Sequence, residues 1–86
     1  MNYLIKKYID KLTINDINNF ALKNDIILND QELSLIYNII KNDYNKLLSK
    51  DYDKVFNKLK DNVSYSNYEK IVSLFKKYEK EYGHLL

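Results

Sequence analysis

Apolar residues in this chain recur every three or four positions, which is the spacing of one face of an α-helix and not the alternation of a strand. In the first segment Leu4, Tyr8 and Leu12 fall on one stripe, while lysine and aspartate fill the opposite side. This arrangement predicts a short amphipathic helix at the start of the chain.

Two capping signals predict where the next two helices begin. In a capping box, a Ser, Thr, Asn or Asp side chain and the residue three positions later exchange hydrogen bonds with each other's backbone. Thr13 precedes Asp16 by three residues, and Asn29 precedes Glu32 by three. We therefore expect a second helix from Thr13 to about Asn24 and a third that begins at Asn29.

The third helix carries the broadest apolar stripe of the chain, so we expect it to be the most buried. It should end at Lys41, with Asn42 in the left-handed position that glycine more often fills. Residues 25–29 are too few for an element of their own, although 26–28 are all apolar. We expect these residues to form a buried connector.

The same signals place two further helices in the second half. The fourth should run from about Ser49 or Asp51 to Asp61. For the fifth, Ser66 and Glu69 form a capping box, and Gly83 is a good stop signal. We read Ser64 and Ser66 as caps and not as nucleophiles, since neither has a nearby histidine and acid.

The absence of proline and the single glycine in 86 residues support an all-helical chain, because these residues break helices and build tight turns. A chain of this length has room for one core. The sequence therefore predicts an all-α fold: a small single-domain bundle of about five short helices over residues 1–86.

The cap and core residues of the second and third helices resemble a known family. The stretch from Thr13 to Ala21, followed by Ile26, Leu28 and Glu32, is similar to the start of the YqfT-like proteins, which are short, all-helical and functionally uncharacterised proteins of low-GC Gram-positive bacteria. The similarity extends to about residue 48. It implies an all-helical fold and no established activity.

Composition argues against most catalytic and metal chemistry. The chain has no cysteine, and His84 is its only histidine, with no second ligand nearby in sequence. The acids near Asp43 and Asp51 lack the turn glycine and the spaced glutamate of a calcium loop. We expect no enzyme activity, no metal and no cofactor. Without an apolar run of about 18 residues, we also expect no membrane span and a cytoplasmic location.

Positive charge is concentrated in the second half. The net charge is −1 over residues 1–43, with five lysines and six acids, and +3 over residues 44–86, with nine lysines and six acids. Lysines of the last two helices could bind phosphates. These candidate nucleic-acid contacts are Lys54, Lys58, Lys60, Lys70, Lys76, Lys77 and Lys80. Binding would not be sequence-specific, because the third helix begins with acids and the chain has no arginine.

Tyrosine provides nine of the twelve aromatic residues, and most tyrosines lie on the predicted core stripes. A few fit those stripes poorly or lie on a helix that is only half covered, and aromatic residues are favoured at protein interfaces. These candidate protein contacts are Tyr3, Tyr44, Tyr65, Phe75 and Tyr82. The sequence therefore favours a non-catalytic protein-interaction or regulatory module that binds another protein or itself. The alternative is a nucleic-acid-binding accessory protein.

Overall fold

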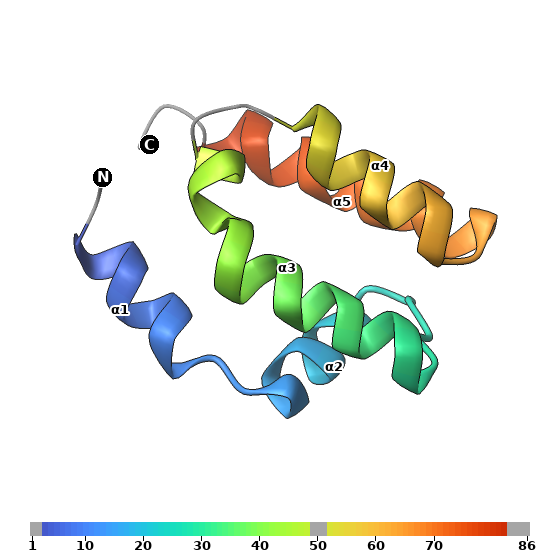
Figure 1. Ribbon diagram of the computed structural model, residues 1–86, viewed down its shortest axis with the longest axis horizontal. Coiled ribbons are helices and arrows are strands. Elements are labelled where there is room, and N and C mark those ends of the chain that lie inside the picture. The colour runs from blue at the N-terminus through green and yellow to red at the C-terminus, as the bar shows by residue number, and fades with distance from the viewer. Residues whose placement is uncertain (1–2, 49–51, 83–86) are drawn as a thin grey trace.

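Five helices make up most of the residues that the computed structural model describes, which are 3–48 and 52–82 (Figure 1). They are α1 (Tyr3–Lys11), α2 (Ile14–Lys23), α3 (Asp30–Leu48), α4 (Asp53–Asn62) and α5 (Tyr65–Tyr82). The described ranges contain no strand. The prediction of an all-α fold with five helices is therefore confirmed.

Helix α3 is the central element of the bundle. It packs against α1, α2 and α4, and α5 lies alongside α4 (Figure 1). The core forms where α3 meets α4, around Ile39, Val55 and Leu59, each of which is at most 5% exposed. Half-buried side chains of α3, α4 and α5 surround these three, and the radius of gyration is 12.4 Å. The central place of α3 agrees with its broad apolar stripe.

The two capping boxes predicted for α2 and α3 are both present. At the start of α2, Asp16 N donates to Thr13 Oγ1 at 3.1 Å and Thr13 N donates to Asp16 Oδ2 at 3.0 Å. At the start of α3, Glu32 N donates to Asn29 Oδ1 at 2.8 Å and Asn29 N donates to Glu32 Oε1 at 3.1 Å. Both boxes satisfy backbone N–H groups that have no partner within the helix.

Helix α2 ends in a left-handed turn that leads into the connector. Ile26 N donates to Ala21 O at 2.9 Å and Asp25 N donates to Leu22 O at 3.1 Å, which is the Schellman pattern. Asp25 has a φ of 60°, a conformation that glycine usually supplies. The connector is buried at Ile26, as expected, but Ile27 is 77% exposed, so the prediction of a wholly buried connector is wrong.

The predicted end of α3 is also wrong, because the helix continues through Lys41 and Asn42 to Leu48. Asn42 lies within the helix, and among the described non-glycine residues the positive φ is found at Asp25. No proline or glycine interrupts residues 42–48, and asparagine is tolerated inside a helix at small cost. Asp43 also forms an ion pair with Lys46 within α3 at 3.7 Å and one with Lys58 of α4 at 3.2 Å, and the second ties this last part of α3 to the bundle.

Helix α5 begins two residues earlier than the capping box of Ser66 and Glu69 predicts. Its cap is Ser64, whose Oγ accepts from Asn67 N at 3.2 Å, and Ser66 lies inside the first turn. Ser64 has the same three-residue spacing to Asn67 that Ser66 has to Glu69, so sequence alone could not choose between them. Helix α4 begins at Asp53 and ends at Asn62. Ser49, Asp51 and Gly83 lie outside the described residues.

Candidate functional site

The most buried polar side chain in the described part of the structure is a carboxylate at the junction of α3, α5 and the connector. Glu32 is 4% exposed and accepts from Ser64 N at 2.8 Å and from Asn67 Nδ2 at 3.1 Å, besides Asn29 N. Asn67 Nδ2 also donates to Ile27 O at 2.9 Å. In the described part of the chain, no buried side-chain nitrogen or oxygen lacks a partner. Glu32 therefore has a structural role and presents no group to a ligand.

The hydrogen bonds around Glu32 set its protonation state. Burial by itself would raise the pKa of this carboxyl group, but the Ser64 N–H, the Asn29 N–H and the Asn67 side chain all favour the charged form. Their combined effect is larger, so the pKa of Glu32 lies below its usual value of 4.5. The group is a carboxylate at neutral pH and is not poised to act as a general acid.

A cluster of three aromatic rings joins α4 to α5. The Phe75 ring lies edge-on to the Tyr52 ring, with centroids 4.8 Å apart, and to the Phe56 ring at 5.5 Å. The Tyr52 hydroxyl donates to Glu79 of α5. Partial burial, this hydrogen bond and the charge of Glu79 raise the pKa of Tyr52 to about 12. Phe75 is thus half-buried by its neighbours within the bundle.

A cavity of about 250 Å³ lies between α2, α3, α4 and α5. Its walls are formed only by apolar and aromatic side chains, among them Ile17, Ala21, Ile39, Val55, Leu59 and Leu74. Phe20 and Tyr78 also line it and are 45% and 36% exposed, whereas the other lining residues are buried or half-buried. Their rings pack together with centroids 5.9 Å apart. We call this ring pair the cavity mouth.

A surface hollow between α1 and α2 adjoins the cavity mouth. Tyr8, Leu12 and Phe20 supply its apolar part, and Tyr8 is 67% exposed. Polar side chains of the same two helices border it, namely Lys11, Asp16, Asn19 and Lys23. We call these seven residues the α1–α2 surface. Exposed aromatic side chains with a polar border are typical of a protein-binding site.

Sequence reasoning missed this surface, because Tyr8 and Phe20 lie on stripes that predict burial. The stripe of α2 buries only Ile17 and Ala21, and leaves Ile14 and Phe20 exposed. Of the described helices, only α3 packs closely on α1, and Tyr8 on another side of α1 is exposed. No local pattern in the sequence distinguishes Tyr8 and Phe20 from stripe residues that are buried.

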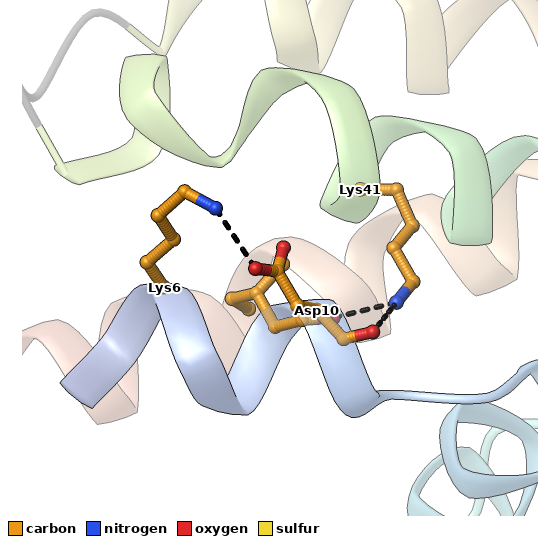
Figure 2. Close-up of polar contacts among 4 residues, drawn as sticks. Lys6, Asp10 and Lys41 are labelled. Atoms are coloured by element: carbon orange, nitrogen blue, oxygen red, sulfur yellow. Dashed lines mark hydrogen bonds and ion pairs between the residues drawn. The ribbon is translucent and has the colours of Figure 1, made fainter. Parts of the chain in front are cut away.

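Helix α1 is attached to the bundle by a lysine of α3 (Figure 2). The Lys41 Nζ donates to Ile9 O at 2.6 Å and to Asp10 O at 2.9 Å, two carbonyl groups in the last turn of α1. A cation suits this position, because the carbonyl end of a helix carries partial negative charge. Lys6 and Asp10 form an exposed ion pair at 2.8 Å within α1, which contributes little stability.

The structure describes the side chains of three of the five predicted protein contacts. Tyr44 is half-buried in α3, and Phe75 belongs to the aromatic cluster described above. Tyr65 is 75% exposed at the start of α5, where a hydrogen bond to Glu69 and the charge of that residue raise its pKa. Tyr3 and Tyr82 lie in α1 and α5, and their side chains are outside the described part of the structure. Contact through these residues stays a prediction.

The predicted nucleic-acid contacts are all exposed, and two of them have partners within the bundle. Lys58 pairs with Asp43 of α3 at 3.2 Å, and Lys70 Nζ donates to Asp25 O at 3.0 Å. The other five make no hydrogen bond or ion pair with residues that the structure describes; they are Lys54, Lys60, Lys76, Lys77 and Lys80. Lys58 and Lys70 thus face different neighbours, α3 and the connector.

Two other kinds of site are absent from residues 3–48 and 52–82. No three His, Cys, Asp or Glu side chains there are grouped closely enough to hold a metal ion. None of the described helices has the length and apolar character needed to cross a membrane.

Comparison with known proteins adds no relative: no family model, no curated protein and no solved structure matches this sequence. The resemblance of residues 13–48 to the YqfT-like proteins therefore stays a prediction.

Proposed function

We propose that this protein is a non-catalytic binding module that docks another protein on the α1–α2 surface. The observation that carries the proposal is the exposure of Tyr8 and Phe20, two large aromatic side chains on adjacent helices that line one hollow. Buried aromatic side chains supply much of the affinity at protein interfaces, and polar residues around them exclude water and set specificity.

The charges around the hollow favour a particular kind of partner. Lys11 and Lys23 outnumber the single acid, Asp16, and the carboxylate of Asp16 already accepts the Thr13 N–H. A partner that presents an apolar side chain flanked by acidic residues would complement both the aromatic and the basic part of this surface. An acidic amphipathic helix fits this description.

Site-specific photocrosslinking tests the proposal. A photoreactive phenylalanine analogue is placed at Tyr8, at Phe20 or at Ile27 in the full chain, and each protein is irradiated in cells. Ile27 is the matched control, since it is an apolar side chain that is 77% exposed and does not line the hollow. We expect the same adduct from positions 8 and 20 and none from position 27.

The partner's identity and the charge preference are tested on that adduct. Lys11→Glu with Lys23→Glu should weaken its formation at position 20 by about tenfold or more, since each reversal turns attraction into repulsion. Adduct formation at position 27 equal to that at positions 8 and 20 would contradict the proposal. An adduct of twice the chain mass would show that the partner is a second copy.

Nucleic-acid binding is the second candidate, favoured by the five exposed lysines that have no partner among the described residues. Binding of this kind weakens steeply with added salt, whereas apolar docking does not. The triple change Lys76→Glu, Lys77→Glu and Lys80→Glu should abolish binding to a labelled single-stranded oligonucleotide. Unchanged binding in this variant would exclude these lysines as the contact site.

A further inference from the structure

The cavity behind the Phe20 and Tyr78 rings is large for a bundle of this size. Protein interiors are packed as densely as organic crystals, with few voids larger than a water molecule. Here about 250 Å³ lies beside the main core, against Ile39, Val55 and Leu59. Unfilled apolar volume loses the packing contacts that its walls would otherwise make. A ligand that fills this volume would therefore stabilise the folded protein.

The walls of the cavity define what could occupy it. Every lining residue is aliphatic or aromatic, and the Tyr78 hydroxyl belongs to a residue at the cavity mouth. Apolar cavities do not hold water but bind hydrocarbons. An engineered cavity of about 150 Å³ in another protein binds benzene, so by proportion a cavity of this size has room for roughly eight to ten carbons. The interior thus suits a medium-length alkyl chain.

The charges near the cavity indicate which chemical group the ligand carries at its exposed end. Lys23 follows Phe20 by three residues on α2 and lies in the hollow that this ring borders. On α5, Lys70 and Lys77 share a second hollow with Leu74, which also lines the cavity. One acid, Asp16 or Glu69, lies in each hollow, against two lysines. Positive charge therefore predominates in both hollows that share a lining residue with the cavity.

We propose that the cavity binds a medium-chain fatty acid, with the alkyl chain among the core side chains and the carboxylate at the mouth between Lys23 and Lys77. The chain replaces missing packing contacts, and the carboxylate stays in water near two cations that have no partner among the described residues. This inference does not depend on protein docking, although Phe20 borders both sites.

Calorimetric titration of the full chain with soluble probes tests the proposal without any mutation. The probes are butanoate, octanoate and 1-octanol, each below the concentration at which it aggregates. We expect saturable one-to-one binding of octanoate, at least tenfold weaker binding of butanoate, and a rise of several degrees in the thermal unfolding midpoint with octanoate. 1-Octanol should bind more weakly than octanoate at low salt. Equal affinities of octanoate and butanoate would show that the alkyl chain does not occupy the cavity. Equal affinities of octanoate and octanol would show that the lysines do not bind the carboxylate.

Two sets of variants locate the ligand. Ala21→Leu adds bulk inside the cavity and should abolish octanoate binding, provided that its helical circular dichroism is unchanged. Lys23→Gln with Lys77→Gln should weaken octanoate binding about tenfold and leave octanol binding unchanged. Lys54→Gln with Lys60→Gln on α4 is the matched control. Unchanged octanoate binding in a folded Ala21→Leu variant would place the ligand elsewhere and overturn the proposal. If that variant does not fold, the shift of Ile17 and Ile39 methyl resonances on adding octanoate to the unmodified protein decides the location, and unshifted resonances overturn the proposal.

Discussion

The side chains of Glu32 and Asn67 form a buried hydrogen bond of 3.1 Å between the first turn of α3 and the first turn of α5. Asn67 is 8% exposed, and its amide nitrogen also donates to the connector carbonyl of Ile27. These two residues are 35 positions apart in sequence. One pair of polar side chains therefore joins α3, α5 and the connector.

Removal of the amide should destabilise the bundle. Asn67→Ala removes one of the two donors to Glu32 Oε1 in a buried place, leaving Asn29 N, and it also removes the donor to the Ile27 carbonyl. Loss of a partner for a buried charged group costs about 2 kcal/mol of unfolding free energy. Urea denaturation followed by circular dichroism measures this difference. The control is Ser66→Ala, at an exposed neighbouring position, which should change stability by about 0.5 kcal/mol at most. Equal losses in both variants would mean that the buried pair has no special role.

The lowered pKa of Glu32 predicts the direction of the pH dependence. The folded state favours the carboxylate, so the unfolded state binds more protons, and the contribution of Glu32 is complete above its usual pKa of 4.5. It is lost as pH falls through the lower folded value. Glu32→Gln should therefore be much less stable than the unmodified protein near neutral pH. The gap in unfolding free energy between the two proteins should narrow in acid. A gap that widens as pH falls, in urea melts at several pH values, would contradict this sign.

The ionisation of the Tyr52 hydroxyl at high pH should report on the contact between α4 and α5. Its folded pKa of about 12 lies above the ordinary value of 10.0, so its contribution to stability is complete below pH 10 and is lost as pH rises toward 12. The difference in tyrosinate absorbance between the unmodified protein and Tyr52→Phe isolates this group. We expect a single ionisation near pH 12. A midpoint close to 10 would show that the hydroxyl does not bind Glu79 in solution.

Lys41 should control how firmly α1 is attached. Lys41→Met keeps the aliphatic stem but removes both hydrogen bonds to the α1 carbonyls of Ile9 and Asp10. Hydrogen bonds of a charged group contribute about 1.5–3 kcal/mol, so amide protection in α1 should fall about tenfold or more. Hydrogen exchange measured by mass spectrometry compares α1 with α4, which should not change. The control is Lys60→Met, an exposed lysine of α4 that has no partner among the described residues.

Local sequence signals predicted the start of a helix correctly where the cap is formed by residues close together in the sequence. Thr13 with Asp16 and Asn29 with Glu32 form the expected caps because each box needs only residues three positions apart. The α5 cap could not be chosen in the same way, since Ser64 and Ser66 both have a suitable residue three positions later. Asn67 decides it, because its side chain is held by Glu32 and Ile27, contacts that no local pattern contains.

The candidate site was less predictable than the helices. Their spacing placed Tyr8 and Phe20 on apolar stripes, but an apolar stripe shows only which residues lie on the same side of a helix. Whether that side is covered depends on how many neighbours the helix has in the bundle. Among the helices that the structure describes, α1 packs closely only on α3, so Tyr8 is exposed, whereas Ile39 in the central helix is buried.

By itself the sequence determined that the chain is helical, about how many helices it forms and which side chains could meet the core, because periodicity, capping and the absence of breakers act within a few residues. The tertiary structure alone decided that α3 continues to Leu48, that Glu32 is buried against Asn67, and that Phe20 and Tyr78 stand over an apolar cavity. These features join residues far apart in the chain, and their formation depends on how all the helices share a limited core.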